Sequence, residues 1–349
     1  MEFVILNSKL EQIHILDEYE SLIWTDRYSE SGDFEIYTSV NERMLDILRS
    51  NDELYLWNSM SEHVMIMDEY SIKSDYDMGS KILITGTSVE QILDRRIVWD
   101  RTTFNGSLQE GIKKLLIENA IQPVNPNRAI PNLKFAETSD TKILGMTCNY
   151  DFSGDNLYEC IKILCNNNHI GFKMSLNDDD VFVMKLYSGE DRSYGQFVNP
   201  YVIFSPEFEN LGSSDYINSK KNYKNVIAIP QTTDSNSQLS PSHDEYNPNN
   251  INGLNRREVL AESRSNDGSY TEDMGKKDLS KYKHNIAVEG NIDASNMYVY
   301  GKDFTIGDIV QIRNEYGFES RSRVTELIMN QSQDKLEIYP TFTSIDKES

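Results

Sequence analysis

Apolar and polar residues alternate through most of the first hundred positions, which is the period of half-buried β-strands. A Ser- and Gly-containing turn at Ser29–Gly32 separates two of these runs and predicts a hairpin. We therefore expect a small, strongly twisted antiparallel barrel or sandwich in this part of the chain. The predicted strands are 1–7, 12–16, 21–28, 32–38, 52–57, 63–75 and 81–89.

Helical spacing of apolar residues appears at three places. A short helix is predicted just after Ser39 and Asn41. Ser107, followed three residues later by Glu110, has the pattern of a capping box and predicts the start of a second helix. A third helix is predicted at about 156–167, and a hairpin with a polar tip at 177–180 follows it. These elements indicate a compact α+β insert.

Strands return after the insert. The runs 225–230, 307–330 and 335–342 alternate, whereas 231–255 is rich in Ser, Asn, Asp and Pro and predicts an exposed loop that a partner could order. Positions 51–70 and 307–329 share a weak internal similarity. The predicted fold class is β-rich α+β with two small antiparallel barrel-like domains and an inserted α+β domain. Their predicted bounds are 1–103, 104–200 and 201–349, with a long loop or insert at about 231–283.

The charge balance argues against a protein that grips nucleic acid. The 349-residue chain has 34 basic and 56 acidic residues and a net charge of −22, so it lacks the excess of cations that neutralises phosphates. The three cysteines lack metal-ligand spacing and predict buried free thiols. No signal peptide or membrane span is expected, because the chain has neither a basic-led apolar start nor a run of 18 apolar residues.

The stretch "WTDRYSESGDFEIY" at 24–37 contains enough carboxylates to suggest acid–base or metal chemistry, and Glu35 with Glu30 or with Asp33 could form a glycosidase pair. The same positions fit the solvated side and the turn of a hairpin, which is the interpretation we favour. None of the five histidines has metal-ligand spacing, and no phosphate-binding glycine motif or nucleophile elbow occurs. We expect no catalytic residues, no metal and no cofactor. The adjacent pairs Arg95–Arg96 and Arg256–Arg257 are expected to meet carboxylates at a protein interface.

Several segments, taken in order, resemble the siphophage tail hub proteins, the tail-associated (Tal-type) baseplate hub family. They span nearly the whole chain. The matching pieces are "WTDRYSESGDFEI" (24–36), "SVEQILDRRIV" (88–98), "NLYECIKILCNNNHIGFKM" (156–174), "YSGEDRS" (187–193), "FSPEFENLGSSDYINSKKNYKNVIAIP" (204–230), "GLNRREVL" (253–260) and "GDIVQIRNEYGFESRSRVTELI" (307–328).

The resemblance implies a non-enzymatic homotrimer at the distal end of the virion tail. Each protomer would contribute two barrel-like tube domains to a pseudo-hexameric ring, with the insert at the periphery. The implied partners are the distal tail protein ring, a tail-tip fibre or lysin, and the end of the tape measure protein. DNA would pass the lumen without specific binding, because an acidic lining would repel it. Relatives that continue further carry receptor-binding or lytic regions, so we expect other proteins to supply those functions here.

The residues expected to serve assembly or the fold lie in these segments. They are Trp24, Arg27, Tyr28, Gly32, Asp33, Phe34, Asp94, Arg95, Arg96, Asp191, Arg192, Arg256 and Arg257. Two alternatives remain open at this point. One is a tail-tip hydrolase of cell wall or polysaccharide that uses a carboxylate pair. The other is a carbohydrate-binding adsorption module, which the Tyr and Trp content would suit.

Overall fold

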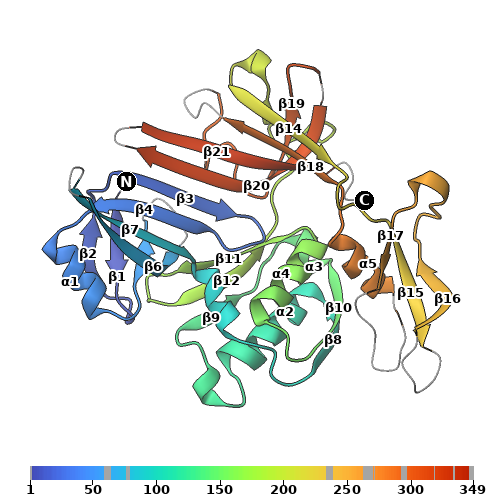
Figure 1. Ribbon diagram of the computed structural model, residues 1–349, viewed down its shortest axis with the longest axis horizontal. Helices are drawn as coiled ribbons and strands as arrows, with labels where there is room; N and C mark the ends of the chain where they lie inside the picture. The colour runs from blue at the N-terminus through green and yellow to red at the C-terminus, as the bar shows by residue number, and fades with distance from the viewer. Residues whose placement is uncertain are drawn as a thin grey trace. The chain divides into compact units, whose positions relative to one another are not determined.

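The N-terminal and C-terminal parts of the chain share one large β-sheet (Figure 1). Strand β3 (Ser21–Arg27) pairs antiparallel with β20 (Glu319–Ser332), and this register puts Arg27 opposite Glu326. Strand β20 pairs as well with β19 (Ile309–Arg313) and β21 (Lys335–Ser344). The C-terminal hairpin therefore continues the sheet that the N-terminal strands begin.

The structure is a computed structural model that describes residues 2–58, 64–75, 79–232, 239–261, 270, 272–291, 297–317, 319–332 and 335–345. Contacts divide the chain into two units. The first comprises Met1–Asp215 with Glu289–Ser349, and the second is Tyr216–Val288. Strands β14 (Ser213–Ser219) and β18 (Asn285–Asn291) cross the boundary between them.

The large sheet has 13 strands and does not close on itself within the described residues. From β20 the order runs β3–β4–β7–β6–β5–β1–β2, and on a branch β13 (Ile203–Phe204) lies parallel to β19. The two separate barrels expected from the sequence are not confirmed, because β20 joins both halves into one sheet. The remaining bounds are β1 (Phe3–Leu6), β2 (Gln12–Leu16), β4 (Asp33–Ser39), β5 (Tyr55–Trp57), β6 (Val64–Asp75) and β7 (Gly79–Ser88).

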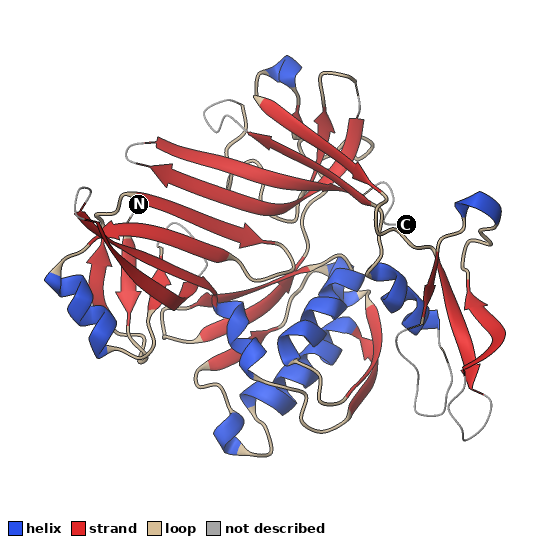
Figure 2. Ribbon diagram, in the orientation of Figure 1, coloured by secondary structure: helices blue, strands red, loops and turns tan. Residues whose placement is uncertain are grey.

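In sequence, an α+β layer comes between the N-terminal strands and the C-terminal strands of the large sheet. Figure 2 shows its helices and strands. It contains a two-stranded sheet, a three-stranded sheet and short helices. Their bounds are β8 (Thr102–Ser107), α2 (Leu108–Leu116), β9 (Leu133–Ala136), α3 (Thr141–Leu144), β10 (Thr147–Phe152), α4 (Leu157–Asn167), β11 (Gly171–Leu176) and β12 (Phe182–Tyr187). A 3₁₀ helix (Val89–Arg95) precedes the layer, and a π-helical turn (Ile117–Ile121) extends α2. Shorter 3₁₀ turns occur at Pro126–Arg128, Pro206–Phe208 and Gly253–Asn255.

One hydrophobic core connects this layer to the first sheet strands. Buried Tyr55 and Ile66 of the sheet belong to the same cluster as Ile112, Leu115 and Phe172 of the layer. The amphipathic spacing in the sequence places these apolar side chains on one side of each helix, so their burial stabilises both parts together. The predicted hairpin is confirmed as β11–β12, which pair antiparallel.

The helix predictions are confirmed with one local difference. Helix α1 (Glu42–Ser50) begins after Asn41, whose side chain accepts a hydrogen bond from the Met44 amide. Asn156 caps α4 in the same way, through the Glu159 amide. Ser107 precedes α2, but its hydroxyl makes no capping hydrogen bond, so the predicted capping box is not formed. No described helix is long and apolar enough to cross a membrane.

The second unit contains regular structure where the sequence predicts mainly a loop. Strand β15 (Val226–Thr232) pairs antiparallel with β16 (Leu239–Tyr246) and parallel with β17 (Glu258–Leu260). Helix α5 (Glu272–Ser280) follows. The polar sequence of β16 has no apolar alternation, so its strand state depends on backbone pairing with β15 rather than on a hydrophobic face.

We predict that Gly32→Ala destabilises the protein by about 1–3 kcal/mol. A Cβ at this position would lie 2.1 Å from the Thr25 carbonyl oxygen, which belongs to the paired strand and cannot yield easily. Gly145→Ala is the matched control, because its added Cβ meets nothing closer than 3.6 Å. Urea denaturation of both variants measures the difference. Equal stabilities of the two variants would contradict this account of Gly32.

Candidate assembly site

Tyr28 lies at the point where three parts of the first unit meet. It follows β3, is 3% exposed, and donates a hydrogen bond to the His169 carbonyl oxygen at 3.1 Å. A Cβ at Gly171 or at Gly307 would lie 2.6 or 2.3 Å from a ring carbon of Tyr28. The ring therefore occupies a space that only glycine at both positions leaves open.

Two further side chains complete this arrangement. The ring of Tyr187 meets Tyr28 edge-on at 5.3 Å, and the Arg323 guanidinium lies 5.2 Å from the centre of the Tyr28 ring. Burial raises the pKa of both Tyr28 and Tyr187, so both phenols remain protonated hydrogen-bond donors. We call this set (Tyr28, Gly171, Tyr187, Gly307 and Arg323) the Tyr28 junction.

Hydrogen bonds from the Ser29–Gly32 turn connect the β3–β4 hairpin to the α+β layer and to the neighbouring strand β7. The Ser29 hydroxyl donates to the Asn166 side-chain oxygen at 2.6 Å, and the Ser31 amide donates to the Tyr158 hydroxyl at 2.8 Å. The Gly32 amide donates to the Ser88 hydroxyl at 2.7 Å. The turn is thus a joint between elements, and its polar residues are used for hydrogen bonds within the chain.

Arg27 connects the hairpin to the C-terminal strand. Its guanidinium pairs with Asp33 and with Glu326, each at 2.6 Å. Beside it, Trp24 is 1% exposed and stacks on Phe3 with ring centres 5.5 Å apart. Phe34 is buried and tilted against Trp24 at 6.1 Å. The predicted group of residues in 24–34 is brought together by the fold, and its described contacts lie within one chain.

The Asp94–Arg96 segment forms a second, separate group. The Asn156 side chain donates to the Asp94 carboxylate at 2.9 Å, which fixes the segment against the start of α4. Arg95 pairs with Glu53, and Arg96 donates to the Arg128 carbonyl oxygen at 2.6 Å. Arg95 keeps 44% of its side chain exposed, so part of this group remains available at the surface.

Asp191 and Arg192 belong to an ionic network with the C-terminal strands. Arg192 donates to Asp308 at 2.9 Å, and Asp308 also accepts from the Glu190 and Thr305 amides at 2.7 and 3.0 Å. Asp308 is 2% exposed, so this buried carboxylate accepts two hydrogen bonds from the 190–192 segment and one from its own turn, which joins the two segments.

Asp191 forms the other half of this network. It pairs with Arg321 at 2.7 Å and accepts from the Ser193 hydroxyl at 2.6 Å. Burial alone would raise the pKa of Asp191, but the hydrogen bonds from Ser193 and the charge of Arg321 outweigh it and hold that pKa below its ordinary value. Asp191 is therefore a fixed anion at neutral pH.

Arg256 and Arg257 lie in the second unit. Arg256 pairs with Glu245 and Glu258, and the Arg257 backbone amide donates to the Asn225 side-chain oxygen at 2.8 Å. The Arg257 guanidinium donates to the Lys220 carbonyl oxygen at 3.1 Å.

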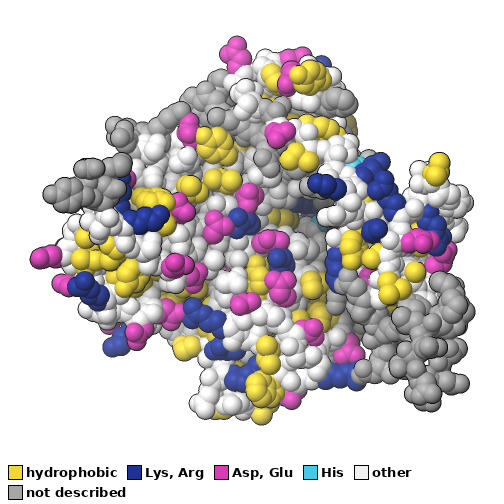
Figure 3. Space-filling model, in the orientation of Figure 1, with side chains coloured by type: hydrophobic (Ala, Val, Ile, Leu, Met, Phe, Trp, Pro, Cys, Tyr) yellow, Lys and Arg dark blue, Asp and Glu magenta, His cyan; other side chains and the backbone are white. Residues whose placement is uncertain are grey.

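Over most of the face in Figure 3, acidic and basic side chains lie interspersed. That distribution agrees with the many ion pairs found within the chain.

Two of the carboxylates that the sequence singled out have cationic partners. Asp33 pairs with Arg27 at 2.6 Å, and Glu30 pairs with Lys162 at 3.2 Å. Within the described residues, no group of His, Cys, Asp and Glu could hold a metal ion. The three cysteines are free and buried, as predicted, and burial raises the pKa of Cys148 to about 11.

The sequence matches the family described as Siphovirus ReqiPepy6 Gp37-like protein over residues 2–342. The chain belongs to this family. It is a family of siphovirus tail proteins, whose place is the virion tail, and the resemblance seen in the sequence is confirmed. No curated protein sequence matches the chain.

The fold of the chain is similar to the folds of solved tail proteins. The 43 kDa tail protein of prophage MuSo2 from Shewanella oneidensis is 11% identical, with a TM-score of 0.58 over 100% of both chains. A tail protein from Neisseria meningitidis MC58 is 10% identical, with a TM-score of 0.56 over 98% of this chain and 96% of that one. The prophage tail protein gp18 of Listeria monocytogenes EGD-e is 13% identical, with a TM-score of 0.55 over 99% and 95%.

Three residues outside the predicted set also hold these networks together. Asp308, Arg321 and Glu326 anchor the networks around Arg192, Asp191 and Arg27. A signal for Asp308 was present, because it directly precedes an alternating strand in "GDIV". No signal marks Glu326, since its pairing with Arg27 follows only from the register of two strands about 300 residues apart in sequence.

We predict that Asp308→Asn destabilises the protein by about 3 kcal/mol, because the amide would turn a donor toward the buried N–H groups from which the carboxylate now accepts hydrogen bonds. Asp33→Asn makes the same chemical change at a side chain that is 46% exposed, and its loss should stay below about 1 kcal/mol. Urea unfolding at pH 7 compares the two variants. Similar losses in both would show that burial of Asp308 is not what makes it important.

Proposed function

We propose that this chain is the structural hub of a phage tail tip, or of the tip of a prophage-derived tail. The observation that carries the proposal is the match in fold to prophage tail proteins along the entire chain, from the first strand to the last hairpin. The hub would be a homotrimer that closes the distal end of the tail tube and connects it to the tip. It would open for the passage of DNA.

The open sheet supports a ring built from several chains. In the proposed hub, residues 1–103 and 201–349 form two tube-wall segments, which become barrel-like when neighbouring protomers complete them, and 104–200 lies outside the wall. Three protomers with two segments each would match a six-fold tube. A sheet with free terminal strands has unpaired backbone groups that a neighbouring chain can satisfy.

The partners follow from this position. The distal tail protein ring would contact one face of the hub, a tail-tip fibre or lysin the other, and the end of the tape measure protein the interior. The net charge of −22 would keep the genome from adhering to the lumen, because carboxylates repel DNA phosphates. The role is structural rather than hydrolytic, since the candidate carboxylates Asp33 and Glu30 sit in ion pairs.

We predict that the purified chain is a trimer in solution. Light scattering should give three times the protomer mass of 40.3 kDa, which is about 121 kDa. A monomer at concentrations of tens of micromolar would contradict the proposal. So would hydrolysis of cell-wall or polysaccharide substrate that disappears in Glu35→Ala, because that result would establish the enzyme alternative.

A further inference from the structure

A short loop carries the two most prominent apolar side chains of its region. We call residues 194–201 the Phe197 loop; it connects the α+β layer to β13. Phe197 is 93% exposed and Val198 is 90% exposed. Single exposed apolar residues are common on proteins, but two adjacent ones at almost full exposure on an ordered loop are typical of a contact site.

Hydrogen bonds hold the loop in one conformation. The Gln196 side-chain oxygen accepts from the Val198 and Asn199 amides at 2.8 Å each, and its nitrogen donates to the Asn199 carbonyl oxygen at 2.9 Å. The Tyr201 hydroxyl donates to the Gln196 carbonyl oxygen at 2.8 Å. The backbone under Phe197 and Val198 is thus fixed before any partner binds, which lowers the entropy loss on binding.

The loop is also tied to the ionic network described above. The Asn199 side chain donates to the Asp191 carbonyl oxygen at 3.0 Å and to the Glu190 carboxylate at 3.0 Å. Tyr194 and Tyr201 meet edge-on at 5.6 Å at the base of the loop. The scaffold is therefore rigid beneath a tip where Phe197 and Val198 are almost fully exposed.

The chemistry of the loop favours a protein surface as its partner. The sequence YGQFVNPY contains no Lys or Arg, so the loop has no cation to attract phosphate groups of nucleic acid or of anionic lipid. The Asn199 side chain of the loop donates to the carboxylate of Glu190, which would repel such groups. An apolar depression on a protein would accommodate Phe197 better.

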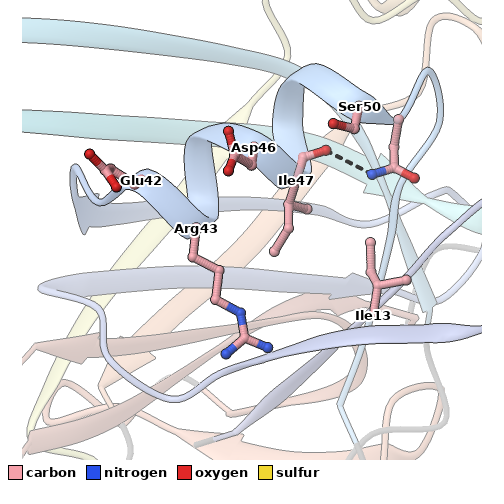
Figure 4. Close-up of a pocket in the computed structure, with 7 residues that line it drawn as sticks. Ile13, Glu42, Arg43, Asp46, Ile47 and Ser50 are labelled. Atoms are coloured by element: carbon pink, nitrogen blue, oxygen red, sulfur yellow. Dashed lines mark hydrogen bonds between the residues drawn. The ribbon is translucent and has the colours of Figure 1, made fainter.

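The first unit has such a depression beside α1. A shallow cavity of about 550 Å³ lies between α1 and β2, and Ile13 and Ile47 give it apolar walls. In Figure 4, Ile47 and Arg43 project from α1 toward the side on which Ile13 lies, whereas Asp46 points the other way. We call this cavity the α1 groove. Its remaining lining residues are Glu42, Arg43, Asp46, Ser50 and Asn51.

The loop and the groove flank two terminal strands of the same sheet. The Phe197 loop leads directly into β13, and the α1 groove includes Ile13 of β2. Among the residues that the structure describes, β13 pairs only with β19, and β2 pairs only with β1. If these two terminal regions of neighbouring copies meet, the loop of one copy comes close to the groove of the next. Each chain then supplies one loop and one groove, as a closed head-to-tail ring requires.

We propose that the Phe197 loop of one copy docks into the α1 groove of a second copy of this chain. The inference rests on the proposed trimeric hub and identifies a contact within it. Phe197 lies against Ile13 and Ile47 in that contact, and the Arg43 guanidinium covers the face of the ring. In the ring, the Phe197 loop of each protomer contacts one neighbour, and its α1 groove contacts the other.

Phe197→Ser tests the proposal. A central aromatic anchor is worth about 2 kcal/mol or more, so the variant should raise the dissociation constant of each interface about 30-fold. Val124→Ser is the matched control, because Val124 is 95% exposed but lies in neither surface, and it should leave the trimer unchanged. Sedimentation over a dilution series measures both, and thermal denaturation verifies that both variants fold.

A cysteine pair supplies a second, independent readout. Phe197→Cys combined with Ile47→Cys should form disulfides between copies under mild oxidation and give dimers and trimers on a denaturing gel, since the three native cysteines are buried. Val124→Cys combined with Ile47→Cys should give none. A wild-type trimer that Phe197→Ser does not weaken and that the pair does not cross-link would overturn this contact and leave the hub proposal intact. A monomeric wild-type protein would overturn both.

Discussion

The first unit depends on one aromatic ring that three distant segments share. Tyr28 reaches from the β3–β4 hairpin into a space that Gly171, at the start of β11, and Gly307, just before β19, leave open. Gly307 also has a φ of +94°, a conformation that favours glycine, so the close approach and the backbone turn require the same residue. A larger side chain at Gly171 or Gly307 would displace the Tyr28 ring. The α+β layer would then shift relative to both parts of the sheet.

Ionic and polar contacts near the Tyr28 ring join the same parts of the chain. Arg27 joins Asp33 to Glu326, and Asp308 joins Arg192 to the segment before β19. The same network continues through Asp191 to Asn199 in the base of the Phe197 loop. The contacts that hold the protomer together therefore also fix the surface that we assign to assembly, which gives a rigid tail component a defined geometry for its neighbours.

Local pattern in the sequence predicts the elements but not how they pair. Asn41 and Asn156 mark their helices, and the alternation around 171–187 predicts β11–β12, because caps and periods act over a few residues. The single open sheet could not be predicted, since the β3–β20 pairing is set by a contact between the two ends of the chain. Phe197 was missed for a related reason: adjacent Phe and Val are ordinary core residues in a sequence, and only the fold exposes them.

The central claim is that this tail protein builds a ring around a channel. Electron microscopy of the purified, unmodified chain, with particles averaged without imposed symmetry, tests it most directly. The account predicts a three-fold ring with an open or plugged centre, in which each protomer contributes two segments to the wall. Asymmetric single protomers, or a two-fold particle without a central channel, would contradict it.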